Sequence, residues 1–163
     1  MSPQLMNAFE SGDLRMQNWV GDTTIGTNTY YYPFKYKVKT SATLTEYSMV
    51  LRLAEQYLIR AEARANQNDL SEAASDLNII RNRAGLNDFA VTDQNTILRA
   101  IQHERQVELF TEWGHRWMDL IRTNQATPVL SLIKTDWQAT DTLYPIPQGE
   151  IQIDPHLTQN EGY

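Results

Sequence analysis

Residues 51–85 read LRLAEQYLIRAEARANQNDLSEAASDLNIIRNRAG, and their periodicity predicts two consecutive helices. The first part belongs to an apolar pattern at helical spacing, which predicts a helix from Glu46 to about Asn66. Alanines at positions 54, 61, 63 and 65 leave room for a neighbouring helix to approach closely. The polar run Asn66–Asp69 ends this first helix.

The second helix is predicted to run from Ser71 to Ala84. Its inward-facing residues are expected to be Ala73, Ala74, Leu77, Ile80 and Ala84. Gly85 follows at the position where a residue of positive φ often ends a helix. The hairpin over residues 51–84 has the 34-residue period of a tetratricopeptide repeat. A single repeat of this kind needs helices on either side to cover both of its faces.

A third helix is predicted from an N-cap at Asp93 to about Phe110, and Gly114 is expected to bend or interrupt it before residues 115–122. Residues 1–45 combine turn signals with aromatic residues, and only a short helix near residues 3–9 is predicted there. Prolines punctuate residues 123–163, which are expected to be irregular.

The expected fold is therefore all-α, or mainly α. It consists of a tetratricopeptide-like helical hairpin plus a further long helix, with long irregular loop segments at both ends. The chain of 163 residues is expected to form a single domain. Its three segments are a loop-rich aromatic segment over 1–45, a helical scaffold over 46–122 and an irregular C-terminal tail over 123–163.

Composition and charge exclude several classes of function. The absence of cysteine excludes disulfides, thiolate metal sites and cysteine nucleophiles. The net charge is −6, and residues 123–163 carry one basic and five acidic side chains. No segment offers the basic surface that nucleic acid requires. No run approaches about 18 consecutive apolar residues, so no membrane span is expected.

Three carboxylates, Glu104, Glu108 and Glu112, step along the third helix at i, i+4 spacing, beside His103 and Arg105. Such carboxylates could supply a general acid and base. The alternative, an ion-pair network with nearby arginines, is favoured because acid–base pairs usually face each other across a cleft. No catalytic residue is assigned. The three histidines lack ligand spacing, and no nucleophile elbow or glycine-rich loop is present, so no metal and no cofactor are expected.

Aromatic residues outside the predicted helices supply the candidates for ligand binding. These are Trp19, Tyr30, Tyr31, Tyr32 and Trp137. Flat aromatic faces stack on the apolar C–H surface of sugar rings, while neighbouring Asn, Gln and Asp groups bind the hydroxyls. The alternative is that these residues cover the helical body. Trp113 and Trp117, four residues apart on a helix, are interpreted as core residues.

Six strings, in matching order and spacing, resemble the C-terminal part of the SusD/RagB family. They are LRLAEQYLIRAEA (51–63), DLNIIRNRAG (76–85), ERQVEL (104–109), GHRWMDLIR (114–122), YPIPQGEI (144–151) and QNEGY (159–163). A looser likeness covers Gly12-Asp13-Leu14-Arg15 and the stretch around residues 32–36. Because these motifs are mostly helical, seven charged residues are interpreted as a structural ion-pair network. They are Arg52, Glu55, Glu104, Arg105, Glu108, Arg116 and Asp119.

The resemblance implies a function that the residues alone do not establish. Members of the family are outer-membrane lipoproteins of polysaccharide-utilisation systems, and they are not enzymes. They bind oligosaccharides or polysaccharides at the cell surface and sit over a TonB-dependent, SusC-like transporter. The resemblance covers about the last third of a family member. The signal peptide and anchoring cysteine are absent from this chain, so Met1 is expected to be an expression boundary or the start of a truncated reading frame.

Two further functions remain open from the sequence. A short helical-repeat piece could dock another protein without touching sugar. A glycoside hydrolase would use two of the carboxylates. Sugar binding, protein docking and sugar hydrolysis give different results in a glycan-binding titration and a reducing-sugar assay.

Overall fold

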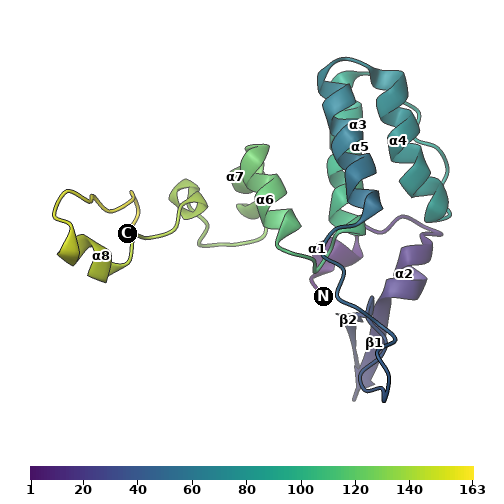
Figure 1. Cartoon of the computed structure of the whole chain (residues 1–163), viewed down its shortest axis with the longest axis horizontal. Coiled ribbons are helices and arrows are strands. Elements are labelled where there is room, and N and C mark those ends of the chain that lie inside the picture. Colours follow the sequence, from purple (N-terminus) through teal and green to yellow (C-terminus); the bar gives the residue numbers. More distant parts are fainter. The chain divides into compact units, whose positions relative to one another are not determined.

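The predicted helical hairpin is present and consists of α3 (Leu53–Asn66) and α4 (Leu70–Arg83). The computed structural model describes residues 1–163, which form two compact units, Met1–His115 and Arg116–Tyr163. In the first unit α5 (Gln94–Glu108) packs beside both helices of the hairpin (Figure 1). The structure is mainly helical, as the sequence predicts.

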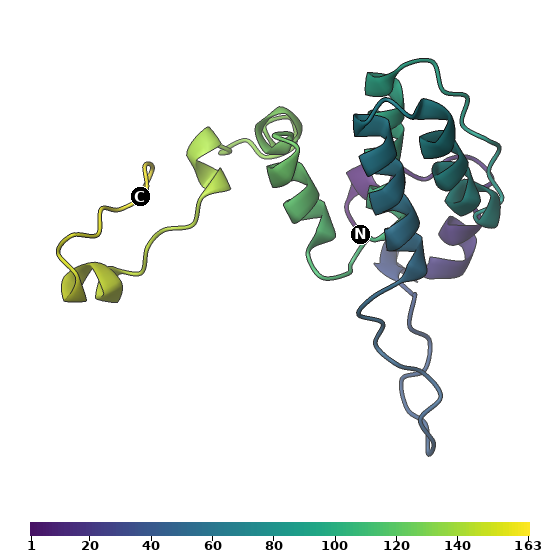
Figure 2. The same ribbon diagram turned by 45° about the horizontal axis from the view of Figure 1, so that its top comes forward.

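The core of the first unit lies where α3, α4 and α5 meet. Leu58, Leu77, Ile97 and Ile101 are fully buried there. All five residues predicted to face inward from the second helix are buried. Alanines at 54, 61 and 65 of α3 are buried as well, which agrees with the close approach of neighbouring helices (Figure 2).

The start of the first helix was predicted too early. α3 begins at Leu53, not at Glu46, and Arg52 before it is extended (φ −123°, ψ 138°). Two contacts hold the preceding segment in an irregular conformation: the Glu46 carboxylate accepts hydrogen bonds from the backbone N–H groups of residues 37 and 38, and the Met49 N–H donates to the Tyr36 hydroxyl. The apolar pattern continued through residues 50 and 51, but both side chains are exposed.

The first 45 residues are more regular than predicted. They contain α1 (Pro3–Met6), α2 (Leu14–Trp19), and an antiparallel pair, β1 (Val20–Ile25) and β2 (Asn28–Pro33). The short helix near residues 3–9 is confirmed, while α2 and the strand pair were missed. A two-residue turn joins the strands, and Gly26 takes the positive φ (63°) that such turns require.

The third predicted helix is confirmed in position and in its cap. The Asp93 side chain accepts a hydrogen bond from the Thr96 N–H (2.9 Å), and α5 ends at Glu108. A tight turn follows, with positive φ at Thr111, Trp113 and Gly114. This turn directs Trp113 outward, where its side chain is 64% exposed and donates to the Met49 carbonyl (3.1 Å). The interpretation of Trp113 as a core residue was therefore wrong.

The second unit consists of short helices joined by irregular segments. Its elements are α6 (His115–Arg122, which begins one residue before the unit), α7 (Ala126–Leu130), the 3-10 helix η1 (Ala139–Thr142) and α8 (Gln148–Ile153). The tail after Thr123 is thus less irregular than predicted. Leu120, Ala126 and Leu130 form a small buried core, with Trp117 partly buried against it. No helix in the structure combines the length and apolar character needed to cross a membrane.

Candidate functional site

Arg15 of α2 is the centre of a buried ion-pair cluster in the first unit. Its Nη1 lies 2.5 Å from Glu104 Oε1 and 3.1 Å from Glu108 Oε2, and its Nη2 lies 2.8 Å from the Asp13 carboxylate. Asp13 also caps α2 by accepting a hydrogen bond from the Arg15 N–H. The Leu14 N–H donates to the Ala84 carbonyl, which fixes α2 at the end of α4. Arg15 therefore joins α2 to α5.

Glu108 is the most heavily paired carboxylate of this cluster. Besides Arg15, it contacts Arg52 Nη1 and Arg83 Nη2, each at 2.6 Å, and it is fully buried. Burial alone would raise the pKa of Glu108, but the nearby Arg83 and Arg52 guanidinium groups outweigh burial and lower it. This carboxylate is held ionised by its partners and is not available as a proton donor near neutral pH.

Glu104, one helical turn earlier, responds in the opposite direction. Burial raises the pKa of Glu104, and the attraction of Arg15 and Arg81 only partly offsets that effect. Glu104 accepts from Arg15, and its second oxygen lies 3.4 Å from Arg81 Nη1. Both carboxylates thus face guanidinium groups and not an open cleft, an arrangement that favours an ion-pair network over a general acid and base.

Glu112 continues the cluster toward the surface. Its carboxylate contacts Lys35 Nζ (2.5 Å) and Arg52 Nε (2.9 Å). The Lys35 ammonium also lies 4.8 Å from the centre of the Trp19 ring and 4.1 Å from that of Phe110. Burial lowers the pKa of Lys35, against the attraction of Glu112. Through Lys35, the cluster therefore extends to the Trp19 ring.

The other residues of the predicted network are distributed differently. Glu55 lies 3.8 Å from Arg105 and 3.5 Å from His115 Nδ1. Arg116 and Asp119 belong to the second unit. Asp119 there pairs with Arg122 at 2.7 Å. Burial lowers the pKa of Arg116, against the attraction of Asp119.

Several members of the cluster were missed by sequence reasoning. They are Asp13, Arg15, Lys35, Arg81 and Arg83. The string Gly12-Asp13-Leu14-Arg15 was the one available signal for the first two. Arg15 and Glu104 are 89 residues apart in the chain, so no local pattern could pair them.

Glu10, His103 and Glu104 bring potential ligand atoms within 4.8 Å of one another, as a metal site would. Their carboxylates are already engaged, however. Glu10 accepts two hydrogen bonds from Arg81, and Glu104 accepts one from Arg15. Guanidinium groups thus neutralise the carboxylates that a cation would need, and we assign no metal to this group.

The three consecutive tyrosines lie on β2 and are about half exposed: Tyr30 at 52%, Tyr31 and Tyr32 each at 42%. Alternation along a strand places Tyr30 and Tyr32 on one face and Tyr31 on the other. Gly21 is the cross-strand partner of Tyr32, and a Cβ there would lie 2.5 Å from the Tyr32 ring. The absence of a side chain at Gly21 thus allows the Tyr32 ring to lie over β1.

The two tryptophan candidates have different surroundings. Trp19 is the last residue of α2, and cationic groups of Lys35, Arg52 and Arg83 lie within 6 Å of its ring centre, at 4.8, 5.8 and 5.9 Å. Trp137 lines an open groove of about 690 Å³ in the second unit. Cations thus already occupy positions over Trp19, whereas Trp137 belongs to a concave surface.

The comparison with protein families decides the identity. The profile of the SusD family matches residues 10–163. The chain belongs to the SusD family. SusD proteins are binding proteins without catalytic activity, which agrees with the neutralised carboxylates and with the expectation of a non-enzyme.

Two curated SusD relatives resemble the chain in sequence. The SusD-like protein P38 of Formosa agariphila is 30% identical over 138 residues, which cover 78% of this chain and 27% of that protein. The starch-binding protein SusD of Bacteroides thetaiotaomicron is 32% identical over 131 residues, which cover 70% of this chain and 21% of that protein. The chain thus matches about a quarter of the length of these relatives.

Solved SusD structures share the fold. A SusD superfamily protein of Parabacteroides distasonis superposes with a TM-score of 0.75 at 25% identity, covering 99% of this chain and 41% of that one. A SusD-like carbohydrate binding protein of Bacteroides vulgatus gives a TM-score of 0.64 at 27% identity, covering 76% and 27%. A further SusD superfamily protein of Bacteroides vulgatus, with a TM-score of 0.78 at 24% identity, supports the fold alone.

Proposed function

We propose that the chain is the C-terminal part of a glycan-binding component of an outer-membrane polysaccharide uptake system. The observation that carries the proposal is the family match over residues 10–163. Two relatives strengthen it, because one is a starch-binding protein and another a carbohydrate binding protein. The ligand is an oligosaccharide or polysaccharide.

Within this function we assign two roles to different residues. The first unit acts mainly as a helical scaffold, stabilised by the Arg15–Glu104–Glu108 cluster. The exposed rings of Tyr30, Tyr31 and Tyr32, and Trp137 in its groove, are the candidates for sugar contact. We assign Trp19 to the scaffold because cations and Phe110 already contact its ring.

The proposal for the cellular setting of the protein rests on its family. We propose that the complete protein is a lipoprotein at the outer surface of the outer membrane. Its protein partner would be a TonB-dependent, SusC-like transporter that receives the bound glycan. Co-purification of the complete protein with such a transporter tests this part separately from sugar binding.

A titration tests glycan binding directly. Isothermal titration of the chain with maltohexaose, preceded by a glycan array, is expected to show saturable binding, while reducing-sugar release stays at the level of buffer. Absence of binding to every glycan on the array would contradict the proposal. Release of reducing sugar would contradict the assignment as a binding protein.

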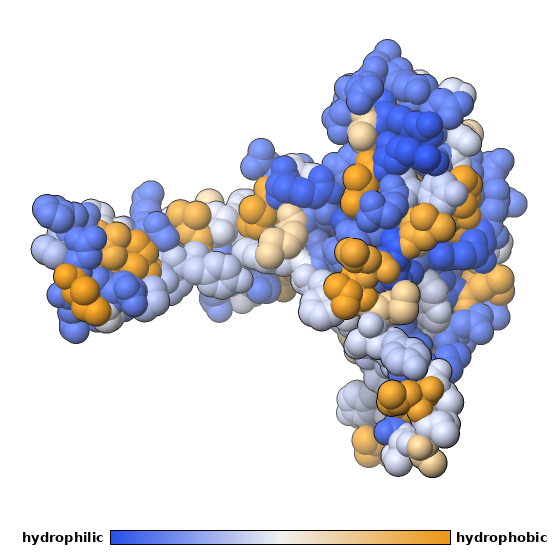
Figure 3. All heavy atoms as spheres, viewed as in Figure 1, coloured by the Kyte–Doolittle hydropathy of each residue, from blue (hydrophilic) through white to orange (hydrophobic).

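A second candidate function, docking of another protein without sugar binding, is favoured by one surface. Four apolar residues near the start of α3 are each at least 49% exposed: Met49, Val50, Leu51 and Leu53. Trp113 is 64% exposed, and its indole N–H donates a hydrogen bond to the Met49 carbonyl. Figure 3 shows hydrophobic residues on the viewed face of the first unit. Exposed apolar strips of this kind commonly mark protein interfaces. Loss of partner binding in Leu51→Asp, with glycan binding unchanged, would identify the strip as such an interface.

A further inference from the structure

A concavity lined by aromatic residues lies wholly within the second unit. The groove around Trp137, with a volume of about 690 Å³, has the size of an ordinary small-ligand site. Four of its lining residues are aromatic, and they come from α6 and from three later segments of the chain. They are Trp117, Trp137, Tyr144 and Tyr163.

Three of the four rings pack against one another. Trp117 packs edge-to-face against Trp137 (ring centres 6.2 Å apart, 74°) and against Tyr144 (6.4 Å, 70°). The Trp137 indole N–H donates to Thr127 Oγ1 (3.3 Å), and the Tyr163 hydroxyl donates to the Leu143 carbonyl (2.9 Å). Such packing orders the aromatic walls before any ligand arrives.

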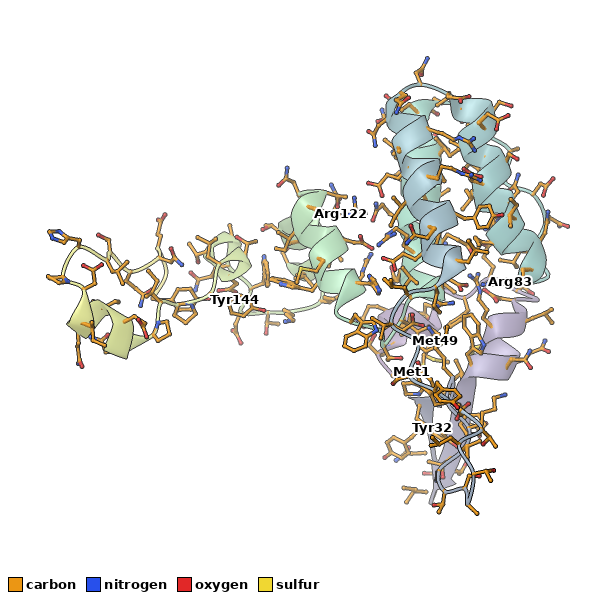
Figure 4. All side chains as sticks on the ribbon, viewed as in Figure 1. Met1, Tyr32, Met49, Arg83, Arg122 and Tyr144 are labelled. Atoms are coloured by element: carbon orange, nitrogen blue, oxygen red, sulfur yellow. The ribbon has the colours of Figure 1, made fainter.

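Tyr144 offers the most accessible ring of the groove. Its side chain is 73% exposed, whereas Trp117 and Trp137 are partly buried. Figure 4 labels Tyr144 in the second unit. An exposed, edge-supported ring beside partly buried indoles is suited to a ligand with flat apolar faces, such as a pyranose ring.

The polar lining adds hydrogen-bond acceptors and little positive charge. Asp136 and Asp141 contribute two carboxylates, and Lys134 contributes one ammonium group. That ammonium lies 5.8 Å from the centre of the Trp137 ring. Carboxylates accept hydrogen bonds from hydroxyls, but they repel an anionic ligand. The charge therefore favours a neutral sugar over a uronate or a sulfated sugar.

We propose that this groove is a binding subsite for a neutral oligosaccharide, with Tyr144 as the stacking platform and Trp137 as a supporting wall. The inference rests on the proposed glycan-binding function and adds to it a location and a ligand class. Asp136 binds sugar hydroxyls in this arrangement. The hairpin tyrosines are not required for it.

The test uses the full chain and two defined probes. Maltohexaose serves as the neutral probe and hexagalacturonate as the acidic one, both measured by isothermal titration. Tyr144→Ala is expected to raise the Kd for maltohexaose about three- to tenfold, the effect of losing one aromatic contact. Trp137→Phe is expected to raise it less. Tyr47→Ala is the matched control, because Tyr47 is 67% exposed and does not line the groove.

The outcomes separate this inference from the proposed function. Weaker maltohexaose binding in Tyr144→Ala at an unchanged melting temperature, with Tyr47→Ala unaffected, supports the groove. Maltohexaose binding that survives Tyr144→Ala and Trp137→Phe but is lost in the combined Tyr30, Tyr31 and Tyr32→Ala variant overturns the groove and leaves the function intact. Binding of hexagalacturonate alone overturns the ligand class. Absence of binding to any glycan overturns the function, and the groove with it.

Discussion

The two units of the chain differ in what they bury. In Met1–His115, three helices enclose fully buried residues such as Leu58, Leu77 and Ile101. In Arg116–Tyr163, only a small core forms around Leu120 and its neighbours. The polar groups differ as well. The first unit buries the carboxylates Glu104 and Glu108 against arginines, whereas in the second unit Asp136, Asp141 and Tyr144 line an open groove.

This difference indicates that the first unit mainly provides stability and that the second provides a surface for ligand recognition. Burial of a leucine-sized side chain stabilises a fold by about 1.5–3 kcal/mol, so most hydrophobic stabilisation belongs to the first unit. A ligand can contact only side chains that are left accessible, and Tyr144 in the second unit is 73% exposed. The first unit is therefore suited to be a scaffold, and the second offers the preformed aromatic surface.

The largest expected effect comes from breaking the buried cluster of the first unit. Arg15→Ala removes a cationic partner from the buried carboxylates Glu104 and Glu108. We expect it to lower the free energy of unfolding by about 3–5 kcal/mol. Urea denaturation followed by circular dichroism measures the loss. Arg99→Ala is the control, because Arg99 is exposed, and it should change the free energy by less than about 0.5 kcal/mol. Equal losses in the two variants would contradict a stabilising cluster.

Truncation of a core leucine compares the two hydrophobic cores directly. Leu77→Ala in the first unit is expected to cost about 2–5 kcal/mol, because the side chain is fully buried among three helices. Leu130→Ala in the second unit should cost less, because few side chains surround it and the site can collapse. The same denaturation assay compares them. A larger loss for Leu130→Ala would reverse the assignment of the scaffold.

Two glycine substitutions, one in each unit, are expected to have smaller effects on stability. Gly85 has a φ of +78°, and a Cβ there would lie 3.0 Å from the Leu14 side chain, so Gly85→Ala is expected to cost about 1–2 kcal/mol. A Cβ on Gly149 in α8 would meet open space. Gly149→Ala should therefore be neutral or slightly stabilising, since alanine favours a helix more than glycine does. Thermal melts of both variants provide the measurement, and a destabilising Gly149→Ala would argue against the open packing.

The smallest expected effect is a change in pH dependence. The pKa of Glu108 is lowered by folding, so its stabilisation is present above the unfolded value and is lost as the pH falls through the folded value. The pKa of Glu104 is raised by folding, so its ionised form destabilises the fold at higher pH, and this destabilisation is relieved as the pH falls through the folded value.

Between about pH 6 and pH 3, Glu108→Gln should therefore flatten the loss of stability, and Glu104→Gln should steepen it. The free energy of unfolding across this range, measured for both variants and the unmodified chain, gives the two slopes. Parallel curves for the two variants would show that their environments do not differ as described.

Much of the helical architecture was predictable because it is locally encoded. The periodic burial of Leu77 and Ile80 and the cap at Asp93 need only neighbouring residues. The strand pair was not predictable from periodicity, because most of its residues are exposed on both faces and no alternation of polar and apolar residues marks it. The sequence signals that it does carry are the turn glycine, Gly26, and the β-branched and aromatic residues on either side of it.

The errors and omissions at the site have long-range causes. Arg52, the extended residue before α3, contacts Glu108, which is 56 residues away, and a helical pattern cannot anticipate such a contact. Trp137 was a sequence candidate, but its groove partners Tyr144 and Tyr163 were not. Both lie in strings that carry the family resemblance, which shows where a signal was present and was not used.

The most direct test of the division between scaffold and recognition surface is hydrogen exchange of the full chain with and without saturating maltohexaose. We predict slower exchange of backbone amides over residues 133–144, around Trp137 and Tyr144, and unchanged exchange over α4 and α5. Protection confined to α4 and α5, with no change over residues 133–144, would contradict the account.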